Sequence, residues 1–146
     1  MKILVPVDGS KYSVEALKTA VNLAEKFNGS IVLTNVQKRV VSRPKSMEFD
    51  VEEFIEDDPD TLRDRGRKLL DKIAEQMEGS SFKVEKCLLV GDPAEKILEC
   101  AEDHKPDMIV IGSLGLTGVR KFLVGSVSSK VVSHSPFPVL VVKTKK

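Results

Sequence analysis

The chain has 146 residues, with 23 Lys and Arg against 22 Asp and Glu, so its net charge is +1. This length predicts one domain spanning residues 1–146, and the balanced charge disfavours a dedicated nucleic-acid-binding protein. No apolar run reaches the roughly 18–20 residues of a membrane span, and the apolar run at 3–7 is too short for a signal peptide. We therefore expect a cytoplasmic protein without nucleic-acid or membrane partners.

The first part of the sequence predicts a strand, a helix and a second strand. Residues 3–7 are mainly apolar, which is typical of a strand buried on both faces. A turn signal follows, and either Ser10 or Ser13 is expected to cap the next helix. That helix ends at residues 28–29, and its apolar face comprises Val14, Leu17, Val21 and Ala24. Residues 31–36 form a second, β-branched run.

Residues 37–60 lack any sustained hydrophobic period. The first part of this segment is basic and the second part is acidic. Segments of this length without regular elements are uncommon in compact domains. We interpret residues 37–60 as a long flexible surface loop. The acidic part is either a solvated charge run or a metal site, and the charge run is the favoured interpretation.

The remaining elements continue to alternate between helix and strand. Helical spacing covers residues 62–77, and the alternation at 82–90 predicts an edge strand with one solvated face. Asp92 and Pro93 begin a helix with an apolar face formed by Ala94, Ile97, Leu98 and Ala101. The last three predicted elements are a strand at 108–111, a helix at 126–133 and a strand at 139–142. This alternation predicts a single α/β domain with a parallel sheet and helices on both faces.

Two strand ends carry the residues best suited to a ligand, because open α/β sheets bind ligands beyond the C-terminal ends of their strands. Asp8 follows the first strand, and Gly112 and Gly115 follow the fourth. Gly125 and Ser126 then open a helix, where a glycine lets a phosphate approach and free N–H groups bind it. From spacing alone, these glycines are either a phosphate site or ordinary turn residues, because P-loop and GxGxxG motifs are both lacking.

Three collinear segments resemble ATP-binding members of the universal stress protein family. The segments are the opening 3–10, the closing 136–142, and residues 111–128 with the spacing Gly112-x2-Gly115-x9-Gly125-Ser126. Together they run along nearly the full chain, so the resemblance extends to the whole domain. Leu114 departs from the family pattern, because many members carry a basic or polar residue there, and one phosphate contact is thereby lost.

The resemblance implies an open five-stranded sheet of order 3-2-1-4-5, a Rossmann-like fold of the adenine nucleotide alpha hydrolase type. It implies a site for ATP, or for AMP or ADP, with Mg²⁺ carried by the phosphates rather than by protein ligands. By this resemblance, Asp8 would bind the ribose hydroxyls or adjoining solvent. The backbone near Val7 and Val36 would contact the adenine. Gly112 and Gly115 would let the ribose and phosphates approach the backbone closely. Ser126 is expected both to cap its helix and to bind. The implied phosphate-binding residues are Gly125, Ser126, Val127 and Ser128.

The two cysteines, Cys87 and Cys100, form no CxxC motif and have no histidine partner that the sequence identifies. They are interpreted as two buried thiols in a reducing compartment, with a disulfide or a catalytic thiol as the alternatives. His104 is placed at a helix C-terminus and His134 in a turn, and both are interpreted as structural residues.

The motifs favour a non-enzymatic nucleotide-binding module that serves stress response or signalling. A slow ATPase or another nucleotide-processing enzyme is the second hypothesis, although no P-loop lysine is present and Asp8 is the only evident general base. A protein-interaction module without a ligand is the third, and the complete glycine signature argues against it. The apolar strand at 139–142, which the family order places at a sheet edge, predicts a homodimer through that edge.

Overall fold

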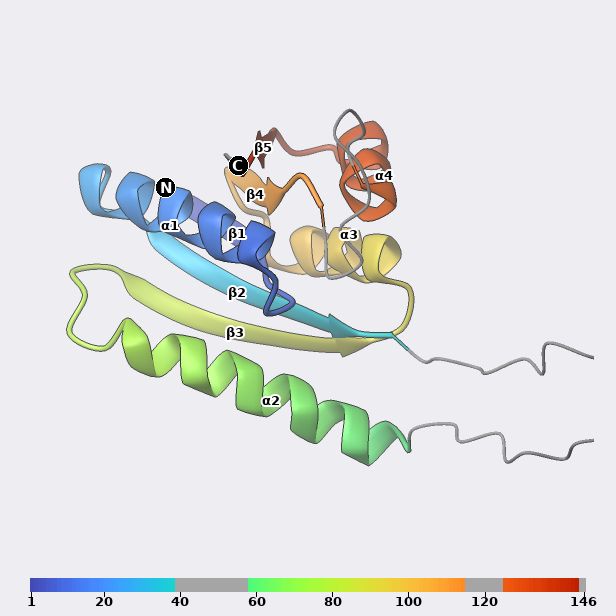
Figure 1. Ribbon diagram of the computed structural model, residues 1–146. Helices are drawn as coiled ribbons and strands as arrows, with labels where there is room; N and C mark the ends of the chain where they lie inside the picture. Colours follow the sequence, from blue (N-terminus) through green and yellow to red (C-terminus); the bar gives the residue numbers. More distant parts are fainter. Residues whose placement is uncertain (39–57, 115–124, 145–146) are drawn as a thin grey trace, which may run out of the picture.

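The computed structural model describes residues 1–38, 58–114 and 125–144. Five parallel strands form one sheet in the order β3-β2-β1-β4-β5 (Figure 1). The described elements are β1 (Lys2–Pro6), α1 (Lys11–Lys26), β2 (Ser30–Gln37), α2 (Pro59–Gln76), β3 (Lys83–Val90), α3 (Pro93–His104), β4 (Met108–Gly112), α4 (Ser126–His134) and β5 (Val139–Val142). The predicted α/β class and the strand order 3-2-1-4-5 are both confirmed.

Helices cover both faces of the sheet in pairs. Ile3 and Val5 of β1 point into a core that β1 shares with α1 and α2, whereas Leu4 points into the core shared with α3 and α4. All three side chains are fully buried. Because successive side chains of a strand point to opposite faces, a strand covered on both sides carries a continuous apolar run. The apolar sequence at 3–7 therefore follows from the central position of β1.

Side chains cap the starts of α1 and α3. The Ser10 hydroxyl accepts a hydrogen bond from the Ser13 amide at 3.2 Å, so Ser10 is the cap of α1. The Asp92 carboxylate accepts a hydrogen bond from the Glu95 amide at 3.1 Å, as predicted for α3. Each such cap typically contributes about 1 kcal/mol to stability.

The predicted buried face of α1 is wrong in part. Val14 is 42% exposed, and Leu17 and Val21 pack at the border of the core. The buried residues of α1 are Ser13, Ala16, Ala20 and Ala24. Small side chains lie beneath the helix because they allow its backbone to approach the sheet closely, while larger apolar side chains lie at the rim. In α3, similarly, Leu98 is only partly buried at the border of the core, while Ala94, Ile97, Cys100 and Ala101 are buried.

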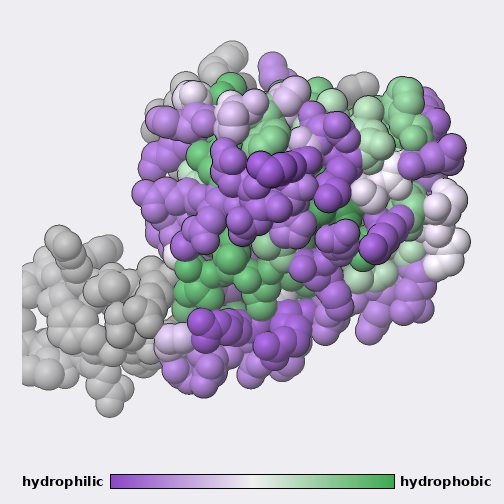
Figure 2. All heavy atoms as spheres, turned by 180° about the vertical axis from the view of Figure 1, so that it is seen from behind, coloured by the Kyte–Doolittle hydropathy of each residue, from purple (hydrophilic) through white to green (hydrophobic). Residues whose placement is uncertain are grey.

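β3 lies at the edge of the sheet, next to β2, as its alternating sequence predicted. Its first residue, Lys83, is exposed, whereas residues 87–90 in its second half are all half-buried. Seen from behind, hydrophobic atoms reach the surface in a band between two hydrophilic regions (Figure 2). Because residues 87–90 are only half-buried, the edge strand keeps part of its apolar second half in contact with solvent.

The ends of the predicted loop at 37–60 belong to regular elements. Gln37 is the last residue of β2, and Pro59 and Asp60 form the start of α2. Proline suits the first turn of a helix, because its missing N–H would have no intrahelical acceptor there. Residues 39–57 lie outside the described ranges, so the loop itself stays a prediction. Among the described helices, none has the length and apolar character needed to cross a membrane.

Candidate nucleotide site

β1 and β4 are neighbours whose pairing stops before their C-terminal ends. They are paired at Ile3 with Met108 and at Leu4 with Ile109, whereas β1 stays paired with β2 along its whole length. The strand order also reverses here, with β2 and β3 on one side of β1 and with β4 and β5 on the other. A reversal of this kind is where open α/β sheets bind ligands, and it coincides with the strand ends at which the sequence predicts a ligand.

Asp8 is half-buried and shapes the turn that follows β1. Its Oδ1 accepts a hydrogen bond from the Ser10 amide at 2.9 Å, and its own amide donates to Ser13 Oγ at 3.3 Å. Gly9 has a φ of +83°, which lies in the left-handed region that favours glycine. One carboxylate oxygen thus holds the turn, while the other has no hydrogen bond to a described residue.

A buried amide joins the ends of β1 and β2. Asn35 is only 2% exposed, and its Nδ2 donates to the Val7 carbonyl oxygen at 2.7 Å. Its Oδ1 accepts a hydrogen bond from Gln37 Nε2, also at 2.7 Å. Asn35 is not among the predicted site residues, although an amide inside the β-branched run 31–36 was the signal that could have identified it. This network fixes the Val7 carbonyl at the edge of the candidate site.

Gly112 ends β4 and packs against the first turn of α1. A Cβ at this position would lie 2.7 Å from the Tyr12 carbonyl oxygen and 2.8 Å from the carbonyl carbon. The buried Ser128 hydroxyl donates to the Gly112 carbonyl oxygen at 2.7 Å. Packing against Tyr12 therefore suffices to require glycine at 112. The single hydroxyl proton of Ser128 is used within the protein, which leaves its backbone amide for a ligand.

α4 begins beside the end of β4. The Gly125 amide donates to the Ser113 carbonyl oxygen at 2.6 Å, and the Gly125 carbonyl oxygen accepts from the Ser129 amide at 2.9 Å. Gly125 is therefore the N-cap, and the expectation that Ser126 caps this helix is wrong, because Ser126 is the first helical residue. The amides of residues 126–128 have no intrahelical acceptor. They form the positive end of the helix dipole.

The other predicted residues supply apolar surroundings. Val7 is buried, while Val36 and Val127 are half-buried and pack against the core beneath α3 and α4. Gly115 lies outside the described residues. The structure thus gathers the turn at Asp8, the end of β4 and the start of α4 at the C-terminal edge of the sheet. Val36 lies at the same edge, on the β2 side of β1.

The two cysteines lie in direct contact, which sequence analysis did not predict. The Cys100 thiol donates to Cys87 Sγ at 2.7 Å, and Cys100 Sγ lies 3.5 Å from His104 Nδ1. Cys100 is buried as expected, but Cys87 is only half-buried. The expectation that the thiols lack a histidine neighbour is wrong, because the four-residue spacing places His104 one helical turn after Cys100.

The sequence model of the universal stress protein family matches residues 1–143. Universal stress protein MJ0531 of Methanocaldococcus jannaschii is 36% identical over 145 residues, covering 99% of this chain and 83% of the relative. A solved structure of hypothetical protein MJ0577 superposes with a TM-score of 0.81 at 34% identity, over 99% of this chain and 96% of that one. A universal stress protein solved in complex with cAMP superposes with a TM-score of 0.69 at 25% identity, over 99% of this chain and 98% of that one. The chain belongs to the universal stress protein family.

Proposed function

We propose that this universal stress protein binds an adenine nucleotide, with ATP as the first candidate, between the C-terminal ends of β1 and β4. The observation that carries the proposal is the start of α4, where the amides of residues 126–128 lack intrahelical acceptors beside the point at which the strand order reverses. Such amides bind phosphate well. A relative of 25% identity is described in complex with cAMP, which supports the same ligand class here.

Each part of the nucleotide has a suitable neighbour. The phosphates would accept hydrogen bonds from the amides of residues 126–128, and Mg²⁺ would be bound by the phosphates. The ribose hydroxyls would donate to the carboxylate oxygen of Asp8 that the turn leaves free. The adenine would lie near the Val7 backbone, which Asn35 holds in place, and near Val36. The occupied module would act in stress response or signalling, with slow turnover or none.

Ser126→Pro is expected to weaken ATP binding by roughly tenfold or more, because it removes one charge-assisted hydrogen bond of about 1.5–3 kcal/mol. Proline is tolerated at the first helical position, and the φ of −59° and ψ of 161° at Gly125 suit the residue before a proline. The fold should therefore survive. Calorimetric titration with ATP and Mg²⁺ measures the loss.

Ser126→Ala is the matched control, because it keeps the amide and removes only the exposed hydroxyl. Its dissociation constant should lie between those of wild type and Ser126→Pro. Equal affinity of wild type and Ser126→Pro would refute phosphate binding at α4. No binding heat with nucleotide-free wild type would favour a module without a ligand. Rapid phosphate release that is lost in Asp8→Ala would favour an enzyme.

We also propose a homodimer through β5, whose outer edge has no described strand beside it. Leu140 is 38% exposed on this strand, whereas Val141 packs into the core beneath α3 and α4. Leu140→Lys should therefore place a charge in the interface without disturbing the core, and it should shift the mass from dimer to monomer. Light scattering at high protein concentration measures the shift. A wild-type protein that remains monomeric there would contradict the proposal.

A further inference from the structure

We propose that Cys87 is an oxidant-reactive nucleophile and that Cys100 captures its oxidised sulfur, so that a reversible disulfide joins β3 to α3. The oxidant class is a hydroperoxide, with hydrogen peroxide as the simplest member. The proposal does not depend on nucleotide binding, because none of its residues, on β2, β3 and α3, belongs to the proposed nucleotide site.

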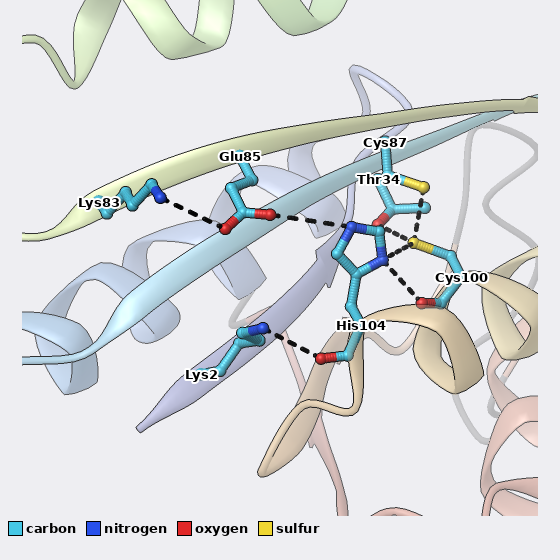
Figure 3. A network of polar contacts seen from close by, with 7 residues as sticks. All are labelled: Lys2, Thr34, Lys83, Glu85, Cys87, Cys100 and His104. Carbon is cyan, nitrogen blue, oxygen red and sulfur yellow. Dashed lines mark hydrogen bonds and ion pairs between the residues drawn. The ribbon is translucent and has the colours of Figure 1, made fainter.

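The fold brings the two thiols together from separate elements (Figure 3). Cys87 pairs with Thr34 across β2 and β3, and Cys100 reaches this pair from the helix that covers it. The sulfur atoms are 2.7 Å apart, and the Thr34 hydroxyl lies 3.4 Å from Cys100 Sγ. A disulfide requires two Cβ atoms that point toward each other at short range. The sulfur contact and Figure 3 show that the two side chains point toward each other at short range.

The two thiols differ in exposure and in acidity. The hydrogen bond from Cys100 and the positive charge of a protonated His104 lower the pKa of Cys87 to about 7, although burial and the carboxylates of Glu99 and Asp103 oppose this shift. The hydrogen bond to Cys87 and burial raise the pKa of Cys100 above its ordinary value. The half-buried Cys87 is therefore the more acidic thiol, and the buried Cys100 donates the hydrogen bond that stabilises its thiolate form.

The surroundings of His104 complete the charge environment of the pair. Its Nε2 lies 3.9 Å from Glu85 Oε2 on β3, and Glu85 is itself 3.9 Å from Lys83 Nζ. The imidazole is thus set between a carboxylate and the thiols, as Figure 3 shows. Thr34, the nearest side chain from β2, carries no charge. Lys2 Nζ, the other nearby cation, contacts the His104 carbonyl oxygen at 3.1 Å. Within the described part of the chain, His104, when protonated, is the one positive group that lowers the pKa of Cys87.

Oxidation takes place in two steps. In the first, the Cys87 thiolate attacks one peroxide oxygen and the O–O bond breaks. The hydroxide that leaves is protonated to water, so the peroxide is reduced and Cys87 becomes a sulfenic acid. Cys100 Sγ then attacks Cys87 Sγ, the S–O bond breaks, and the departing hydroxide takes the thiol proton as a second water. Two thiols and one peroxide give one disulfide and two waters. A dithiol reductant reduces this disulfide back to two thiols by thiol–disulfide exchange.

A metal site is the competing use of the same residues. The ligand atoms of Cys87, Cys100 and His104 all lie within 4.8 Å of one another. Two thiolates on a tetrahedral zinc would be roughly 3.8 Å apart, given a Zn–S bond of about 2.3 Å. The sulfur atoms are much closer than that, at 2.7 Å. His104 Nδ1 also lies 2.9 Å from the Cys100 carbonyl oxygen, to which it donates its proton, so this nitrogen has no lone pair for a metal. The short separation of the two sulfur atoms therefore favours the disulfide.

The test treats reduced, chelator-washed protein with one equivalent of hydrogen peroxide and follows intact mass and free thiol. Wild type should lose two hydrogens and both thiols within one chain, and dithiothreitol should restore them. Cys100→Ser should stop at a sulfenic acid that dimedone traps, whereas Cys87→Ser should keep its thiol. The wild-type rate should rise roughly tenfold between pH 6 and pH 8, following the thiolate fraction of a group with a pKa of about 7.

His104→Gln is the variant that isolates the charge effect, because it removes the positive charge and leaves both thiols in place. The pH at which its oxidation rate is half-maximal should be higher than in wild type, while the final product should still be the disulfide. Thermal unfolding of each variant in the reduced state checks that the fold is kept. Three outcomes would overturn the proposal: thiols that survive the oxidant, a product that links two chains, and equimolar Co²⁺ binding with thiolate-to-cobalt absorption that shields the thiols from peroxide.

Discussion

Gly112→Ala should destabilise the protein by about 3 kcal/mol, at the upper end of the range for overpacked cores. The added Cβ would lie 2.7 Å from the Tyr12 carbonyl oxygen, and this neighbour is helix backbone that cannot rotate away. Relief requires α1 or the end of β4 to move. Because the Gly112 carbonyl oxygen also accepts a hydrogen bond from the Ser128 hydroxyl, the start of α4 should move together with the end of β4. Chemical denaturation measures the change in free energy of unfolding.

Gly125→Ala provides the matched comparison at the same edge of the sheet. Its Cβ would lie 3.2 Å from the Ser113 carbonyl oxygen, and its φ of −59° is accessible to alanine. The expected cost is about 1 kcal/mol or less, mainly from replacing glycine at an N-cap. If Gly112→Ala instead abolished ATP binding without loss of stability, the glycine would be required by the ligand rather than by Tyr12.

Gly66→Ala should lower the free energy of unfolding by about 1–2 kcal/mol, although alanine is normally favoured over glycine inside a helix by about 1 kcal/mol. Gly66 is buried in α2, and an added Cβ would overlap Leu88 Cδ1 and lie 2.8 Å from Asn35 Oδ1. Leu88 is half-buried and can rotate. Asn35 cannot, because its amide is bonded to Val7 and Gln37. The packing cost should therefore exceed the gain in helix propensity.

Lys68→Ala is the control for this second prediction, since Lys68 is exposed on the same helix and its replacement should change stability by no more than about 0.5 kcal/mol. Urea denaturation of the two variants beside wild type gives the comparison. A Gly66→Ala protein more stable than wild type would show that α2 shifts freely on the sheet. In that case the Asn35 network would not be the rigid element that holds Val7.

The elements were predictable from the sequence because each carries a local signal. Continuous apolar runs marked β1 and β4, and the Asp92-Pro93 pair marked the start of α3. Strand order required more than these signals, since alternation alone gives a parallel sheet without fixing neighbours. The order came from the resemblance of the glycine spacing to a known family. The position of the candidate site then followed from the reversal between β1 and β4.

Contacts between distant residues were not predictable, because a linear pattern does not determine how far a helix is rotated. The buried face of α1 was predicted wrongly for this reason. Alanine is less hydrophobic than valine, yet the alanines of α1 face the sheet while Val14 is exposed. The contact of Cys87 with Cys100 depends on how α3 lies over β3. The cap of α4 was misplaced by one residue, because glycine and serine are both common caps.

β1 occupies the middle of the sheet although it precedes the other strands in the chain. Its partner β2 begins at Ser30, whereas its partner β4 begins at Met108. During synthesis, the partner strand for one side of β1 is made early, whereas the partner strand for the other side is made only after most of the chain. Unpaired strand edges template wrong pairings, and contacts of long sequence separation form slowly. The order of the strands in the chain therefore makes the pairing of β1 with β4 the step of sheet formation that is most open to wrong partners.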